Sequence, residues 1–148
     1  MRYHWKNVIG AACLALCGMG LPLSASADDK DVIAYRQHIM RAIDAQTAAL
    51  GMVLSGAVPE DNLVSHLETI AVAAQAGLAS FEAKIAGGES SPDVWAKWPD
   101  FSTRMNDFAA NTAKVAKMAR EQGKDAIMGE IATALSCKSC HDAYRVKK

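Results

Sequence analysis

The run Cys-Lys-Ser-Cys-His at positions 137–141, close to the C-terminal end of this 148-residue chain, constrains its fold more than any other feature. Two thiols at this spacing can each add across a vinyl group of haem, and the histidine that follows is then held beneath the iron as an axial ligand. Almost the whole chain precedes the motif. The preceding residues must therefore fold so that they enclose a flat cofactor anchored near the end of the chain.

Residues 1–27 have the pattern of a secretory signal peptide. The segment starts with basic side chains, is apolar from residue 8 to 19, and ends in Ala-Ser-Ala, a small-residue cleavage site, before Asp28. The apolar stretch is too short for a comfortable membrane span, so no stable span is expected after cleavage. Because c-type haem is attached outside the cytoplasm, the segment and the haem motif together predict a periplasmic protein.

The mature chain, residues 28–148, is long enough for one domain with its own core. Cleavage removes Cys13 and Cys17, so the two cysteines of the motif are the only ones left and no structural disulfide is available. Loss of Arg2 and Lys6 leaves 14 Lys and Arg against 16 Asp and Glu, a formal charge of −2. This balance does not indicate nucleic-acid binding.

Two other functions of a Cys-x-x-Cys pair fit the sequence less well. A thioredoxin-like redox dithiol lies in a βαβ setting, which this chain lacks. A zinc site needs a second pair of ligands, and outside the motif the mature chain offers only His38 and His66, which we expect at the surface. The favoured interpretation is one covalently bound haem c, attached through Cys137 and Cys140 with His141 as ligand.

Four stretches of the mature chain repeat apolar residues at steps of three and four, which predicts four helices. Gly and Pro residues separate the stretches, and none alternates as a half-buried strand does. Four helices of similar length with short connections favour an all-α, antiparallel up-down-up-down four-helix bundle. The predicted helices span residues 30–55, 60–86, 100–122 and 125–146.

Three stretches of the chain resemble the class II c-type cytochromes, the family of cytochrome c′ and its low-spin, methionine-ligated relatives. They are Tyr35-Arg36-Gln37, Gly87-Gly88-Glu89 with Pro92, Asp93 and Trp95, and the run from Cys137 to Arg145. The resemblance spans the mature chain and implies a four-helix bundle with one haem. For the site it implies thioether bonds at Cys137 and Cys140, proximal ligation by His141, and haem-propionate contacts from Arg36 and Gln37, with Glu89 nearby.

The residue that faces the distal side of the iron varies in this family, and here the resemblance implies Met40. Where family members have Leu or Phe, the iron stays five-coordinate and can take up small gases. The chain departs from cytochrome c′ proper at this position. A methionine there predicts six-coordinate, low-spin haem with His141 and Met40 as its axial ligands.

Bundle geometry without the family supports Met40 less strongly. In an up-down-up-down bundle, Met40 and His141 lie about 13 Å and about 8 Å from the same end, so haem between them could be bound from both faces. Met105 is also nearly level with them, whereas the methionines at 52, 118 and 128 fall near the far end. The alternative for Met40 is a flexible side chain that fills a gap in the core.

Two arginines are candidates for contacts with the haem propionates. Arg36 interrupts an apolar stripe, and a buried guanidinium needs an anionic partner. Arg145 lies one turn beyond His141 and could act in the same way, although a solvated surface arginine is the alternative for both. Together with lysines 138, 147 and 148, Arg145 makes this end basic, which could steer an acidic redox partner; charged tails are usually only solvated.

These features predict a monohaem protein that carries single electrons between redox partner proteins, whose identity the sequence does not give. No nucleophile–base pair or phosphate loop accompanies the motif, so no enzymatic activity is predicted; a peroxidase would need a distal acid–base partner, and none is evident. The alternative is a five-coordinate haem protein that binds nitric oxide or carbon monoxide. Members of the resembled family often dimerise through their first two helices, so the resemblance implies that this chain can form a homodimer.

Overall fold

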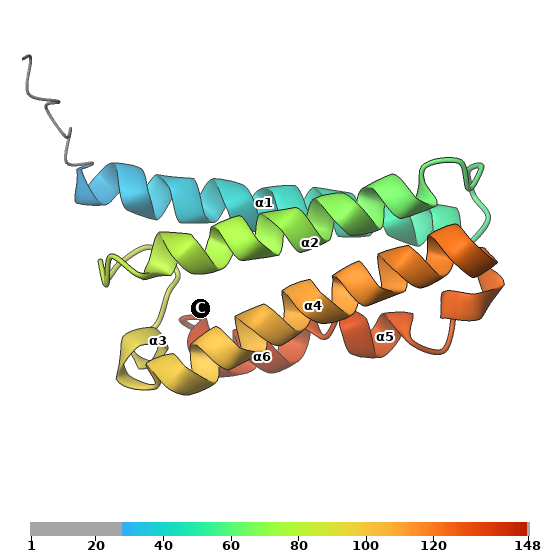
Figure 1. The fold of residues 1–148 in the computed structure, drawn as a ribbon. Helices are drawn as coiled ribbons and strands as arrows, with labels where there is room; N and C mark the ends of the chain where they lie inside the picture. The colour runs from blue at the N-terminus through green and yellow to red at the C-terminus, as the bar shows by residue number, and fades with distance from the viewer. Residues whose placement is uncertain (1–27, 148) are drawn as a thin grey trace, which may run out of the picture.

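In the computed structural model, which describes residues 28–147, the chain forms an antiparallel helical bundle (Figure 1). The first two helices run side by side in opposite directions, and the third long helix packs along the second. The chain then returns through three short helices towards the end where it began, which confirms the predicted up-down-up-down order. The elements are α1 (Asp29–Leu54), α2 (Leu63–Phe81), α3 (Asp93–Ala96), α4 (Trp98–Gln122), η1 (Asp125–Ile127), α5 (Ile131–Ala134) and α6 (Cys137–Tyr144).

The ends of the long helices follow from local sequence. The Asp28 carboxylate caps α1 by accepting the Lys30 amide at 3.2 Å, and two more acidic residues lie in the first turn, at the positive end of the helix dipole. α4 has Pro99 in its first turn, where a missing amide hydrogen costs nothing. It ends at Gly123, whose φ of 82° suits glycine. The predicted signal peptide lies outside the described residues.

The largest departure from the prediction is in the fourth helix. Residues 125–146 form three short helices rather than one continuous helix. Gly129, which has a low helix propensity, lies in the first break. In the second break Leu135 has φ −101° and ψ 43°, and its carbonyl accepts the Cys137 amide at 2.8 Å. α6 therefore begins at the first cysteine of the haem motif instead of carrying the motif in mid-helix.

α2 ends at Phe81, earlier than the predicted end at residue 86. The Phe81 carbonyl accepts the Trp95 indole N–H at 2.9 Å and the Lys84 amide at 3.1 Å. These two bonds, and not a further turn of α-helix, satisfy this last carbonyl of α2. Lys84 itself has a φ of 51°, which an α-helix does not accommodate. The chain leaves α2 as an irregular loop over residues 82–92. Within the described residues the only β-type pairing is isolated, from Ser90 to Gly87 and to Arg145.

The bundle has two packed clusters of apolar side chains. The central cluster fills most of its length, and each fully buried Leu or Ile in it contributes about 1.5–3 kcal/mol. Its largest fully buried members are Leu50, Leu67, Ile70, Ile127, Val53 and Val115. The aromatic cluster lies where α2 ends and α4 begins, and Met40 packs against both clusters. Its buried members are Phe81, Val94, Phe101, Met105 and Tyr144, with Leu78, Trp95, Trp98 and Cys140 packed around them.

Candidate haem-binding site

α6 presents the two cysteines of the motif one turn apart. Cys137 and Cys140 are both half-buried free thiols, and their i, i+3 spacing places them on one side of the helix. Cys140 packs against the aromatic cluster, and this burial raises the pKa of its thiol. The imidazole of His141, the next residue, is exposed. The three groups needed to attach and ligate one haem therefore share a single short helix.

A polar network that the sequence did not reveal fixes α6 against the start of α4. The Tyr144 hydroxyl donates to the Asp100 carboxylate, which also accepts Arg104 Nε–H at 2.8 Å. The Arg104 guanidinium lies 5.8 Å from the Tyr144 ring and also reaches the Ser139 carbonyl at 3.5 Å. The hydrogen bonds from Tyr144 and Arg104 lower the pKa of Asp100, and burial followed by the bond to Asp100 raises that of Tyr144 to about 12.

The loop after α2 joins α1 to the end of α6. On one side the Ile85 carbonyl accepts Arg36 Nη2–H at 2.7 Å. On the other, the Ser91 amide donates to the Tyr144 carbonyl and the Val146 amide donates to the Glu89 carbonyl, both at 2.9 Å. An ion pair between the side chains of Glu89 and Arg145 adds to this second attachment. The loop therefore closes the end of the bundle where the haem motif finishes.

Two glycines let this loop approach α1 closely. A Cβ on Gly87 would lie 2.7 Å from Ile33 Cδ1, and one on Gly88 would lie 3.0 Å from Ile33 Cγ2 and 3.1 Å from Gln37 Nε2. Both glycines also have positive φ, 133° and 66°. The half-buried side chain of Gln37 thus lies against the loop, close to Arg36 in the sequence.

Arg36 is the one buried charged side chain of the described residues, with 3% of its surface exposed. Its guanidinium carbon lies 4.9 Å from the Phe81 ring and 5.3 Å from the Trp95 ring, and desolvation lowers its pKa. Nη2 is bonded to Ile85, but Nη1 is buried without a hydrogen-bond partner. A buried donor of this kind is costly unless an anion accepts its hydrogen, so the residue fits a haem propionate.

Two methionines lie at the aromatic cluster: Met105 is a buried member of it, and Met40 packs against it and against the central cluster. Met40 of α1 is half-buried, and Met105 of α4 is 6% exposed. Of the methionines predicted to lie far from the site, Met52 and Met128 are about half exposed and Met118 packs against the central cluster. Both Met40 and Met105 meet the aromatic cluster, and which of them would face the iron stays a prediction.

The remaining histidines are separate from these groups. His38 is exposed, as predicted, while His66 is half-buried and hydrogen-bonded through Nδ1 to Gln46 Oε1 at 2.7 Å. Across residues 28–147, no three or more His, Cys, Asp and Glu side chains are grouped so that they could hold a metal ion.

The family model described as Cytochrome C′ matches residues 31–145. The chain belongs to the cytochrome c′ family. A cytochrome c′ from Alcaligenes xylosoxydans xylosoxydans is 28% identical over 127 residues, which cover 82% of this chain and 98% of the relative. A cytochrome c-556 from Agrobacterium tumefaciens (strain apple 185) is 31% identical, covering 76% and 93%. A nitrosyl complex of a cytochrome c prime variant from Alcaligenes xylosoxidans superimposes with a TM-score of 0.75 at 25% identity, covering 82% and 98%.

Membership of the cytochrome c′ family confirms the fold, the cofactor and the class of protein. The all-α bundle matches that of the solved relative. The family consists of non-enzymatic proteins that bind one covalent haem c, and here Cys137 and Cys140 form the attachment pair. The roles of His141 and Met40 as axial ligands stay predictions. Among residues 28–147, no helix is both long enough and apolar enough to cross a membrane.

Two of the basic side chains around the motif are paired with carboxylates. Lys138 forms an ion pair with Asp142 on the same helix, and Arg145 pairs with Glu89. Arg145 is exposed in this pair, in contrast to the buried Arg36. The basic end predicted from the sequence therefore offers less unpaired charge than a count of its Lys and Arg suggests.

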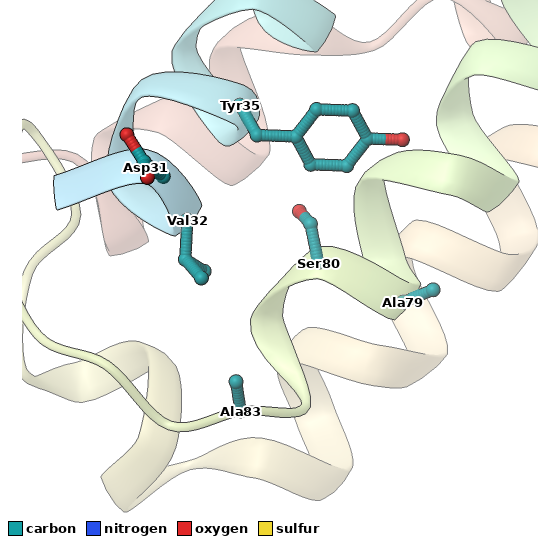
Figure 2. Close-up of a pocket in the computed structure, with 6 residues that line it drawn as sticks. All are labelled: Asp31, Val32, Tyr35, Ala79, Ser80 and Ala83. Carbon is teal, nitrogen blue, oxygen red and sulfur yellow. The ribbon is translucent and has the colours of Figure 1, made fainter. Parts of the chain in front are cut away.

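A surface hollow lies elsewhere on this cytochrome c′ family protein. It has a volume of about 400 Å³ and is formed between the start of α1 and the end of α2 (Figure 2). Tyr35, from the Tyr-Arg-Gln element, forms one wall with 54% of its surface exposed. None of the cysteine, histidine or methionine candidates lines it. The lining residues are Asp31, Val32, Tyr35, Ala79, Ser80 and Ala83.

Proposed function

We propose that this cytochrome c′ family protein carries single electrons, with haem held by Cys137 and Cys140 and its iron bound by His141 and Met40. The observation that carries the proposal is the position of Met40, whose methyl carbon reaches the interior of the bundle beside Gly77. The bound haem would supply an iron centre that gains or loses one electron. Thioether ligation favours ferrous iron, and a filled sixth position leaves the geometry almost unchanged on electron transfer. Both properties suit a carrier.

Arg36 and Gln37 position the cofactor in this proposal. Nη1 of Arg36 would donate to a propionate oxygen while Nη2 keeps its bond to Ile85. Gln37 lies against Gly88 on the adjoining loop, where its amide can donate a second hydrogen bond. The support is chemical, because a buried guanidinium stacked on two rings lacks an anion that a propionate would provide.

Glu89 and Arg145 have a different part in the proposal. Their side chains already form an ion pair with each other, and the Glu89 carbonyl accepts the Val146 amide. We therefore assign both residues to holding the loop against the end of α6, near the propionates. Arg145 would then contribute mainly by holding the loop in place, and less by binding a propionate directly.

We place this activity in the periplasm. The support is the signal-peptide pattern of residues 1–27, followed by a cytochrome domain over residues 28–148, together with a haem type that is attached outside the cytoplasm. The partners would be redox proteins. Because Lys138 and Arg145 are paired with carboxylates, charge steering of an acidic partner has little support.

Binding of nitric oxide or carbon monoxide is the second candidate function, and the comparisons favour it over electron transfer. Several similar solved structures of cytochrome c prime from Alcaligenes xylosoxidans are complexes with nitric oxide. Gas binding needs a sixth iron position that is open or readily vacated. A methionine at position 40 opposes this, because its sulfur has to leave before a gas can bind.

Spectra of the haem-loaded protein distinguish the two functions. For the electron carrier we expect a low-spin ferric protein at neutral pH with the weak near-infrared sulfur-to-iron band, and no spectral change when the reduced protein is titrated with carbon monoxide. A ferric protein that is high-spin without the band, and prompt, tight binding of carbon monoxide, would reject Met40 ligation and establish the gas-binding function instead.

A further inference from the structure

Met40 and Met105 approach the same point inside the bundle from two different helices. A Cβ built on Gly77 of α2 would lie 3.5 Å from the Met40 methyl carbon and 3.3 Å from the Met105 methyl carbon. The ends of both thioethers therefore lie within 3.5 Å of one position. Three helices contribute to this arrangement: α1 and α4 each supply a methionine, and α2 supplies the residue between them.

Gly77 leaves the room in which the two methionines meet. It is buried in α2, four residues before the helix ends at Phe81, and within a helix glycine costs about 0.5–1 kcal/mol relative to alanine. A methyl group there would meet Met105 at a distance tighter than ordinary van der Waals contact. Because Gly77 has no side chain, it leaves space for the two methionines, whose side chains have three rotatable bonds and a polarisable sulfur.

Met105 also shares its surroundings with the haem-anchoring helix. It belongs to the aromatic cluster, which includes Tyr144 of α6 and has Cys140 packed against it. Met40 borders the same cluster from α1. Other strong ligands near the site are engaged or directed elsewhere, since the Tyr144 hydroxyl is bonded to Asp100 and His38 is exposed.

We propose that Met105 is a reserve axial ligand, whose sulfur binds the haem iron when Met40 leaves it. The inference rests on the proposed function, because it requires that a distal methionine ligates the iron at all. In the exchange one iron–sulfur bond breaks and another forms, while no proton or electron is transferred. A gas that displaces Met40 must then compete with a second, tethered sulfur for the same position.

The experiment compares ferric spectra of the wild type, Met40→Leu, Met105→Leu and the Met40→Leu, Met105→Leu double variant. Leu for Met nearly conserves volume, so each variant should fold, which circular dichroism checks. Met118→Leu is the matched control, because Met118 is a partly buried methionine of α4 that packs on the central cluster. We expect Met105→Leu and Met118→Leu to match the wild type, Met40→Leu to keep a low-spin population with the sulfur-to-iron band, and the double variant to be fully high-spin.

Carbon monoxide titration of the reduced variants measures the same competition. If Met105 occupies about nine in ten iron sites in Met40→Leu, its removal in the double variant raises the apparent affinity for carbon monoxide about tenfold. Equal affinities and equally high-spin spectra for these two variants would overturn the reserve-ligand inference while leaving Met40 as the ligand. A low-spin Met40→Leu protein without the sulfur band would also overturn it, because a nitrogen ligand would then have replaced the sulfur.

Two further outcomes bear on the proposed function separately. A wild-type protein that lacks the band would reject both the proposed function and the reserve ligand, since neither sulfur would bind the iron. Loss of the band in Met105→Leu alone would make Met105 the resident ligand and would overturn the roles given to both methionines.

Discussion

Arg36 of α1 donates from Nη2 to the carbonyl of Ile85, 49 residues further along the chain, at 2.7 Å. The same guanidinium stacks on the Phe81 and Trp95 rings and keeps Nη1 buried without a protein partner. One side chain therefore ties α1 to the loop that closes the bundle and still has a donor for an anion. In the proposed function, the fold and propionate binding therefore depend on the same residue.

Replacing Arg36 by Met should destabilise the haem-loaded protein by about 1–3 kcal/mol, because the Ile85 carbonyl loses its donor and the propionate loses its cation. The free energy of unfolding by denaturant, measured on the holoprotein, tests this. Arg41→Met is the matched control, since Arg41 is an exposed arginine of the same helix that bonds only the Gln37 carbonyl. Equal losses in the two variants would contradict a special role for Arg36.

Alanine at Gly87 should destabilise the protein by at least about 1 kcal/mol. The new Cβ would lie 2.7 Å from Ile33 Cδ1, and the φ of 133° disfavours any side chain. Gly51→Ala provides the contrast, because Gly51 is a helical glycine of α1 with nothing within 4 Å of its Cβ position, and there alanine should stabilise by about 0.5–1 kcal/mol. Thermal unfolding of both variants checks the opposite signs, and a neutral Gly87→Ala would contradict the close packing of the loop.

The sequence predicts the bundle well because long amphipathic helices are encoded locally, by apolar spacing and capping residues. The bounds of α1 follow from that pattern within one residue at each end, and those of α4 within two residues at its start. The breaks in the fourth helix could not be predicted in the same way. The turn at Leu135 depends on its carbonyl, which accepts the Cys137 amide, and the spacing of apolar residues gives no sign of such a bond.

The sequence predicts the candidate site residues that are adjacent in the chain. It does not predict those that depend on contacts between distant segments. Cys137, Cys140 and His141 follow from one motif, and the burial of Arg36 follows from its place in an apolar stripe. The link from Tyr144 to Asp100 joins residues 44 positions apart. The i, i+4 spacing of Asp100 and Arg104 was visible in the sequence, but it did not reveal that the pair also holds α6.

Covalent attachment of haem should survive unfolding. Heated in denaturant, the wild-type holoprotein should keep its haem, because two thioether bonds join the cofactor to Cys137 and Cys140. Each single Ala variant retains one thiol for attachment, whereas Cys137→Ala, Cys140→Ala should fail to mature. Haem staining after denaturing electrophoresis measures this, with Ser139→Ala between the two cysteines as the control. Release of the haem from denatured wild-type protein would contradict thioether attachment.

Ionisation of Tyr144 should limit stability at alkaline pH. Burial and the bond to Asp100 raise the pKa of this phenol from 10.0 to about 12, so the fold stabilises the protonated form. This contribution is complete below about pH 10 and is lost as the pH rises from about 10 to about 12. The unfolding midpoint of the wild type should therefore fall over this range more steeply than that of Tyr144→Phe, which has no phenol to ionise. Parallel curves for wild type and Tyr144→Phe would show that the link to Asp100 contributes nothing to this pH dependence.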